Sequence, residues 1–519
     1  MRFKKLAAIM AMVQAAFLAP GLAHAAWLES SSEHFVIYAD DSERDITRFS
    51  QQLERYHAGM VLLLGSKLAA PSPSNRVTVY VVKNEREVRE LYGENSKYVG
   101  GFYLPRAGGS LAIVPAVQAT DGAITWSMVV LLHEYAHHFQ ISTSAMAMPR
   151  WFTEGSAEFF ASGKFESDGS IWLGRPANHR AGELLYARDV KAADLLDPTE
   201  YDKRKPGSYD AFYGKSWLLY HYLTFSELRG EPRKGQLSRY LALLREGKGQ
   251  RDAAIEAFGD FGVLEKELDR YMAKSKMGAL RLTADKVPIG EIKVRALAAG
   301  EAAIMPVRIR SKRGISREEA PALLVEARAV AARFPSDAAV LSALAECEYD
   351  AGHDKEAVAA ADAALKLDPS QVNAYVEKGL ALFRIAPEAD DTAAAYKAAR
   401  APFLALNRIE NDHPLPLVYF YRSFLEQGRE PPQIALDGLV RATQLAPFDQ
   451  GLRMNLGQSL MRAGRRDDAR NVLLPVAYDP HGGGMSEFAR KVIARMEKEP
   501  TWKGQWDEAE EGAAGDAGK

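Results

Sequence analysis

The chain has 519 residues, which is too long for one ordinary hydrophobic core and predicts several domains. Hydrophobic residues make up 47% and charged residues 26%, a composition that excludes a mostly disordered, collagen-like or multi-spanning membrane protein. Because 66 Lys and Arg stand against 68 Asp and Glu, the net charge is −2, and no bulk basic character indicates a nucleic-acid partner.

Residues 1–25 have the pattern of a signal peptide. A positively charged start is followed by an apolar run over 6–18, a break at Pro20-Gly21 and the small-residue pattern Ala23-His24-Ala25. The apolar run is too short for an ordinary membrane span, although a retained N-terminal anchor is the alternative. The pattern predicts export, most simply to a bacterial periplasm, with no transmembrane segment after signal removal.

Residues 26–120 alternate between strand and helix patterns and predict an α+β subdomain. β-Branched and aromatic residues mark the strands, and Ser42 and Gly65 mark the two ends of a long helix. The predicted elements are, in chain order, a strand over 34–39, a helix over 42–64, a strand over 76–82, a helix over 85–92 and a hairpin of 101–104 with 110–114.

The middle of the chain has two different patterns. Residues 121–278 are predicted to be mainly helical, with one hairpin near 165–173. Residues 279–314 carry short apolar runs, such as Val287-Pro288-Ile289 and the run 303–307, and predict a linker or a short β segment.

Residues 315–498 repeat. Pro335 and Pro369 lie 34 residues apart, each after an Ala-rich helix, and the small residues between them fall where a tetratricopeptide repeat places its packing positions. The spacing returns twice more, a degenerate unit contains Gly379, and 486–496 predicts a capping helix. An unrelated helical bundle is the alternative. Residues 499–519, rich in Glu, Gly and Ala, predict a disordered tail.

One nearly all-apolar helix pattern, over 126–140, contains His133-Glu134-Tyr135-Ala136-His137. Residues i and i+4 lie on one helical face, so His133 and His137 can bind one zinc ion. Glu134 lies about 100° further round the helix, from where it can reach a water on that ion rather than the ion itself. Buried imidazoles and carboxylates are costly unless they are paired or bind a metal.

A second predicted helix over 149–160 places Glu154 and Glu158 on one face, 17 and 21 residues after His137. Two acids on an apolar strip suit a zinc ligand, Glu154, and an acceptor that orients a ligand histidine, Glu158. The alternative is that both acids pair with Arg150 or other basic groups.

His-Glu-x-x-His followed by Trp151-Phe152-Thr153-Glu154-Gly155-Ser156-Ala157-Glu158 resembles the gluzincin metallopeptidases, in particular the aminopeptidase N-like branch and its peptidase MA-like relatives. The resemblance covers roughly residues 95–225. It implies a thermolysin-like zincin domain, zinc held by His133, His137 and Glu154, Glu134 as general base, and a peptide or protein substrate. Tyr213 matches the family tyrosine that steadies the oxyanion.

The sequence departs from the family in two respects. The gap between His-Glu-x-x-His and Glu154 is slightly shorter than in aminopeptidase N itself. The Gly-Ala-Met-Glu-Asn segment that captures a free amino terminus is absent, and 100–105 stands in its place. That segment can still act as an edge strand that pairs with an extended peptide. His179 is predicted to be a surface-loop histidine or an oxyanion donor, and His138 a packing residue.

The sequence therefore predicts an exported zinc metallopeptidase: an α+β subdomain, a mainly helical zincin domain and an all-α tetratricopeptide solenoid with a protein partner. The alternative is a non-catalytic, zinc-stabilised binding protein on a peptidase fold. The only cysteine, Cys347, excludes a disulfide framework and is predicted to be a buried small apolar side chain.

Overall fold

The structure is a computed structural model of the chain. It describes residues 27–65, 70–93, 99–115, 124–144, 146–197, 199, 201, 209–230, 232–479 and 482–504. The predicted signal peptide lies outside the described residues, as does the predicted tail from residue 505 onward. None of the described helices is long and apolar enough to span a membrane.

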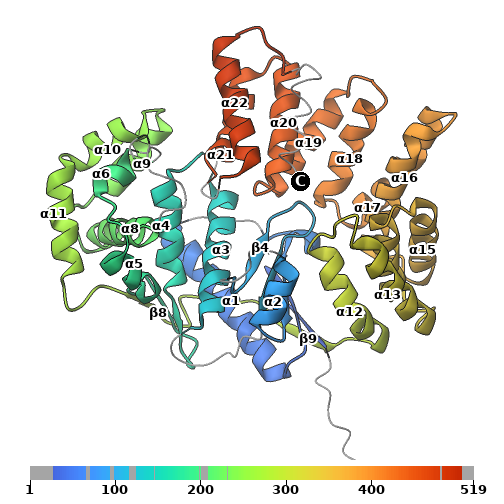
Figure 1. Cartoon of the computed structure of the whole chain (residues 1–519), viewed down its shortest axis with the longest axis horizontal. Coiled ribbons are helices and arrows are strands. Elements are labelled where there is room, and N and C mark those ends of the chain that lie inside the picture. The colour runs from blue at the N-terminus through green and yellow to red at the C-terminus, as the bar shows by residue number, and fades with distance from the viewer. Residues whose placement is uncertain are drawn as a thin grey trace, which may run out of the picture.

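A six-stranded mixed sheet forms the N-terminal part (Figure 1). Its central strands β2, β3 and β5 run parallel to one another. At one side β4 pairs antiparallel with β5, and at the other β1 pairs antiparallel with β2 and β9 pairs antiparallel with β1. The predicted hairpin is therefore the pair β4–β5, and β4 is the strand at one edge. In sheet order the strands are β4 (Phe102–Leu104), β5 (Leu111–Pro115), β3 (Val77–Val82), β2 (Phe35–Ala39), β1 (Leu28–Ser31) and β9 (Lys293–Ala296).

Helices cover both faces of this sheet. Because strand side chains alternate, Ile37 and Val79 face one core, with α1 (Glu43–Leu64) and α3 (Trp126–Thr143), whereas Tyr38 and Tyr80 face the other. The second core also contains α2 (Glu85–Tyr92) and α12 (Ala299–Lys312). The Ser42 side chain caps α1, and Gly65, with φ 62°, ends it as predicted.

The helical part next to the sheet carries α3 and α4 side by side. A three-stranded antiparallel sheet adjoins it, made of β6 (Lys164–Phe165), β7 (Ile171–Leu173) and β8 (Leu280–Leu282). The remaining helices of this part are α4 (Arg150–Ala161), α5 (Ala181–Tyr186), α6 (Ala192–Leu196), α8 (Phe212–Arg229), α9 (Gln236–Arg245), α10 (Gln250–Phe258) and α11 (Phe261–Met272).

The segment 279–314, predicted as a linker or short β segment, has a larger role. Its two strands complete both sheets, and the apolar run 303–307 lies in helix α12 rather than in a strand. Met305 and Ile309 of α12 pack on the sheet, whereas Ile304 and Val307 pack on the repeat helices. A helix that is buried on two sides has no single apolar face, so its sequence lacks a clear helical period. For this reason the apolar run 303–307 resembles a strand in the sequence.

Residues 315–498 form the predicted array of helix pairs. Helices α14 and α16 begin at Ala338 and Val372, 34 residues apart, and each helix packs on its neighbours in the chain. At Gly379 an added Cβ would lie 2.3 Å from the Phe403 ring, so the small residue permits the close helix contact. The helices are α13 (Ala320–Arg333), α14 (Ala338–Asp350), α15 (Asp354–Leu367), α16 (Val372–Ile385), α17 (Thr392–Ile409), α18 (Pro414–Leu425), α19 (Gln433–Leu445), α20 (Gln450–Arg462), α21 (Arg466–Ala477) and α22 (Gly484–Lys498).

The array curves around one end of the sheet (Figure 1). Glu410 accepts hydrogen bonds from the Ser74 N–H at 2.9 Å and from its hydroxyl at 2.8 Å, and Asp449 accepts one from the Ala107 N–H at 2.8 Å. Part of the repeat surface that we expected to receive a partner is therefore covered by the chain itself. The first residues of the predicted disordered tail are also packed, since Trp502 lies against the core of the last helices.

Candidate metal centre

Two helices bring the predicted ligands together. The buried helix α3 carries His133 and His137, and α4 carries Glu154. Gly155 sets the depth of α4, because an added Cβ there would lie 2.3 Å from the backbone oxygen of Ser216 on α8. The Glu-Gly pair thus places a carboxylate toward α3 and lets the two backbones of α4 and α8 approach closely.

The three donor atoms form a nearly equilateral triangle. The Nε2 atoms of His133 and His137 are 3.0 Å apart, and Glu154 Oε2 lies 3.3 Å from each. Tetrahedral ligands at about 2.0–2.2 Å from a zinc ion are separated by roughly 3.3–3.6 Å. The triangle therefore has the size of three corners of a zinc coordination shell.

Glu154 supplies an independent test of that fit. Its side chain is fully buried, and among the described residues neither carboxylate oxygen accepts a well-formed hydrogen bond. A buried, unsatisfied carboxylate is costly, whereas a metal ion would satisfy it. In the part of the chain that the structure describes, His133, His137 and Glu154 are the one group of His, Cys, Asp or Glu residues close enough to hold a metal ion.

The electrostatics of the group are strongly coupled. Burial lowers the pKa of His133, but the carboxylates of Glu158 and Glu154 outweigh it and raise this pKa to about 10. Burial raises the pKa of Glu154, but the imidazoles of His137 and His133 bring it below its ordinary range. Because histidine binds a metal through a deprotonated ring nitrogen, metal binding would release any proton that the two carboxylates hold on His133.

Glu158 contacts the first of the two histidines. Its Oε1 lies 3.1 Å from Nδ1 of His133, which leaves Nε2 of that ring for the metal group. Glu158 is itself held by His179 Nε2 at 2.5 Å and by Arg180 Nη2 at 2.6 Å. The expectation of a surface-loop His179 is therefore wrong, because its ring is committed to Glu158. Sequence reasoning missed Arg180 entirely, since no spacing rule links it to α4.

Tyr213 lies beside His133, and Glu134 follows His133 in helix α3. The Tyr213 ring centroid is 6.5 Å from that of His133, and Arg150 is a hydrogen-bonding neighbour of its hydroxyl. Burial and the Glu154 charge raise the pKa of Tyr213 to about 12 against the opposing Arg150, so the phenol is protonated at neutral pH. The half-buried Glu134 is near enough to Tyr103 of β4 to help burial raise the pKa of that phenol.

The other candidate residues lie apart from the metal group. His138 donates to or accepts from the Tyr103 hydroxyl at 2.5 Å and packs on Phe448, so it joins β4, α3 and the repeat array. Tyr209 is 67% exposed, and Cys347 is buried in the array.

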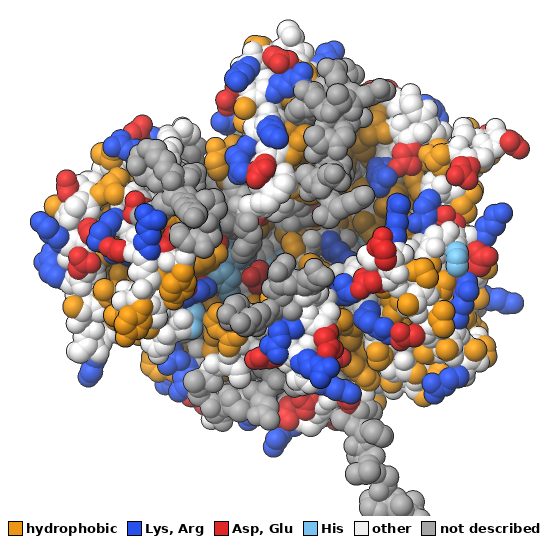
Figure 2. All heavy atoms as spheres, in the orientation of Figure 1, with side chains coloured by type: hydrophobic (Ala, Val, Ile, Leu, Met, Phe, Trp, Pro, Cys, Tyr) orange, Lys and Arg blue, Asp and Glu red, His pale blue; other side chains and the backbone are white. Residues whose placement is uncertain are grey.

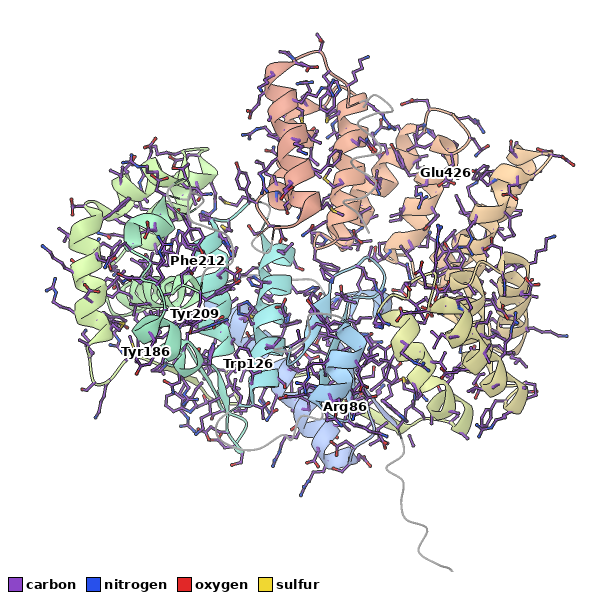
Figure 3. The ribbon with its side chains drawn as sticks, viewed as in Figure 1. Arg86, Trp126, Tyr186, Tyr209, Phe212 and Glu426 are labelled. Atoms are coloured by element: carbon purple, nitrogen blue, oxygen red, sulfur yellow. The ribbon has the colours of Figure 1, made fainter. Side chains whose placement is uncertain are left out.

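An exposed aromatic side chain lies near His179. Figure 2 shows histidine atoms at the surface within a depression on this face of the molecule. Trp126, 45% exposed, begins α3 with its ring centroid 6.1 Å from that of His179. Figure 3 shows Trp126, Tyr186 and Tyr209 on the side of the molecule that carries α3–α5.

No family model matches the chain, and no curated protein matches it. Among solved structures, it is similar to a thermophilic TPR protein of Thermus thermophilus, with 16% identity, a TM-score of 0.32, and coverage of 38% of this chain and 97% of that one. It is also similar to MamA, with 14% identity, a TM-score of 0.26, and coverage of 40% and 99%. The repeat architecture rests on the helix pairs described above.

Proposed function

We propose that the protein is an exported zinc-dependent peptidase with a protein-binding repeat domain. The observation that carries this proposal is the triangle of His133, His137 and Glu154, with its buried and unsatisfied carboxylate. Donors of this type and spacing suit zinc, and three protein ligands leave a fourth position open, as catalytic zinc sites do.

The residues around the triangle supply the parts that peptide hydrolysis needs. A zinc ion bound there would lower the pKa of a water molecule to about 7 and polarise the substrate carbonyl. Glu134 would accept the proton of the attacking water and pass it to the leaving amine. Tyr213, held protonated by burial and by Glu154, would donate a hydrogen bond to the oxyanion that develops on the carbonyl.

Strand β4 offers a place for an extended substrate. It lies at the edge of the sheet, and the charge of Glu134 contributes to the raised pKa of its Tyr103. An edge strand presents unpaired backbone groups to which a peptide can add as a further strand. A peptide bound in this way would run past the metal group, with its carbonyls beside Glu134.

A non-catalytic, zinc-stabilised scaffold is the alternative. It needs the three ligands and Glu158, but it has no need of a carboxylate at Glu134 or of a protonated phenol at Tyr213. The presence of both groups in the chain supports the enzyme over the scaffold.

The test is a digest of an unbiased peptide library by the purified, zinc-loaded protein. We expect cleavage, its loss when a chelator removes the metal, and its return when zinc is added back. Zinc binding at one ion per chain without cleavage of any peptide would contradict the peptidase proposal and favour the scaffold.

A further inference from the structure

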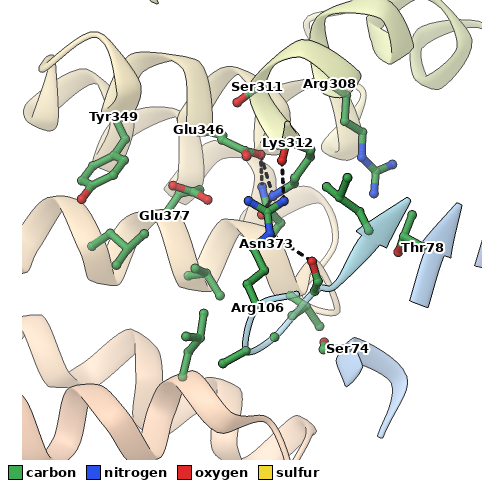
Figure 4. A pocket seen from close by; sticks show the side chains of 18 of the residues that line it. Ser74, Thr78, Arg106, Arg308, Ser311, Lys312, Glu346, Tyr349, Asn373 and Glu377 are labelled. Carbon is green, nitrogen blue, oxygen red and sulfur yellow. Dashed lines mark hydrogen bonds and ion pairs between the residues drawn. The ribbon is translucent and has the colours of Figure 1, made fainter. Parts of the chain in front are cut away.

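A cavity lies between the turn of hairpin β4–β5 and the helices α12, α14 and α16 (Figure 4). Its volume is about 630 Å³. This lies in the range of about 300–1,000 Å³ that is usual for pockets that bind organic ligands. None of the metal-centre residues lines it, and two different parts of the fold close it.

The basic side chains of the cavity wall, Arg106, Arg308 and Lys312, are already committed, and Arg308 lies over the Tyr38 ring at 4.9 Å from its centroid. Arg106 reaches in from the turn and donates to the backbone oxygens of Gly109, at 3.0 Å, and Lys312, at 2.5 Å. The Lys312 ammonium lies 2.9 Å from Glu346 Oε2 and donates to Asn373 at 2.8 Å. One acid, Glu346, is therefore neutralised by a close partner.

Glu377 has no such partner. It lines the cavity from α16 and is 4% exposed, and among the described residues no hydrogen bond or ion pair reaches its carboxylate. Figure 4 shows this carboxylate on the cavity wall without a marked interaction, whereas marked interactions join Glu346 to its neighbours. Asp350 lines the same cavity and accepts a hydrogen bond from the Ser311 hydroxyl at 2.8 Å.

The charges around Glu377 favour an added cation. Burial and the charges of Glu346 and Asp350 raise the pKa of Glu377 well above its ordinary range, against Lys312 and Arg106. Ionising a buried carboxyl group that has no partner is costly, and a bound positive group would lower that cost by stabilising the carboxylate form of Glu377.

The geometry argues against a metal ion as that cation. The described residues contain no group of three acids in this cavity whose oxygens come close enough for one ion. An ammonium group at the end of a carbon chain fits better, because Tyr349, Val376 and Leu380 line the same cavity and offer it apolar surface.

We propose that this cavity binds an organic ligand through a primary ammonium group, which pairs with Glu377 and lies beside Asp350. The ammonium belongs to a free amine, to the amino terminus of a peptide or to a lysine side chain. Binding here is independent of the proposed peptidase activity.

The experiment is a calorimetric titration of the full chain with n-pentylamine, and with pentan-1-ol as a neutral probe of the same length. We expect one pentylamine per chain and much weaker binding of the alcohol. Glu377→Gln should weaken pentylamine binding about 30-fold or more, as when one partner of a buried charge pair is lost. The matched control is Glu356→Gln, which removes an exposed acid of the neighbouring α15 and should leave binding unchanged.

Competition identifies the source of the ammonium. Triglycine against its N-acetylated form tests an amino terminus, and Nα-acetyl-lysine amide tests a lysine side chain. The proposal is overturned if no ammonium probe binds, if pentan-1-ol binds as tightly as pentylamine, or if Glu377→Gln binds pentylamine like the wild type. If circular dichroism shows that Glu377→Gln is unfolded, Asp350→Asn replaces it, and unchanged affinity in that folded variant overturns the proposal.

Discussion

Nδ1 of His133 lies 3.1 Å from Oε1 of Glu158, and this contact fixes which nitrogen of the ring faces Glu154. Glu158 is fully buried and is held in turn by His179 and Arg180. The metal group is therefore built on a chain of charged contacts that runs from η2 (Asn178–Arg180) through α4 to α3.

Glu158→Gln is expected to lower zinc affinity by about 10–100-fold, the usual effect of losing a partner that orients a ligand histidine. The change keeps the size of the side chain but removes its charge, so it also leaves Arg180 without its buried carboxylate. Chelator competition at fixed pH measures the effect. Glu166→Gln, which changes an acid paired with Lys164 elsewhere, is the control. Unchanged zinc affinity in folded Glu158→Gln would contradict the orienting role.

Tyr213→Phe is expected to lower kcat by about 10²–10³-fold with little change in KM, because its hydrogen bond matters mainly in the transition state. The exposed Tyr209 provides the matched control, since Tyr209→Phe should cost less than about tenfold. Steady-state kinetics at saturating zinc measures both. His179→Ala should act instead on zinc affinity through Glu158. A large kcat loss confined to zinc-saturated His179→Ala would transfer the oxyanion role to that residue.

Glu410→Ala is expected to destabilise the whole chain by about 1–3 kcal/mol, because it leaves the two Ser74 donors without their acceptor. The contact joins the sheet to the repeat array, so both parts should unfold at a lower temperature. Thermal unfolding followed by circular dichroism measures this, with the exposed Glu388→Ala as control. A melting temperature equal to that of the control would show that the contact contributes nothing.

The contribution of Asp350 to the stability of the folded chain should fall as pH rises from about 4 to about 6. Burial and the Glu346 charge raise the pKa of Asp350 to about 6, against the Ser311 hydrogen bond and the charges of Lys312 and Arg384. In this window the unfolded chain releases a proton that the folded chain retains, so deprotonation favours unfolding.

Asp350→Asn removes that titration. The melting temperature of the variant relative to wild type should therefore rise between pH 4 and pH 6 and then level off. A difference that does not change over this interval would contradict a raised pKa at Asp350.

Local rules in the sequence predicted much of the fold. The capping residue Ser42 and the ending residue Gly65 marked α1, and 85–92 formed the predicted short helix. Helix periodicity predicted that His133 and His137 share one face of α3, and that Glu154 and Glu158 share one face of α4. The meeting of His133, His137 and Glu154 is a tertiary contact between the two helices, which periodicity does not determine.

Long-range contacts were not predictable in this way. Helix α12 is buried between the sheet and the array, so its apolar pattern has no single face. His179 and Arg180 reach Glu158 from a separate turn, and the hairpin turn reaches the repeats by tertiary packing alone. A single sequence indicates which side chains share a helix or strand face, but it does not indicate which residues far apart in the chain are in contact.

Glu134→Gln tests the central claim most directly. The substitution keeps the size of the side chain and all three proposed ligands but removes the proton acceptor. With zinc content verified at one ion per chain, turnover of a library-derived peptide should fall by about 10²–10⁴-fold or more. Cleavage at the wild-type rate by the zinc-loaded variant would contradict the account.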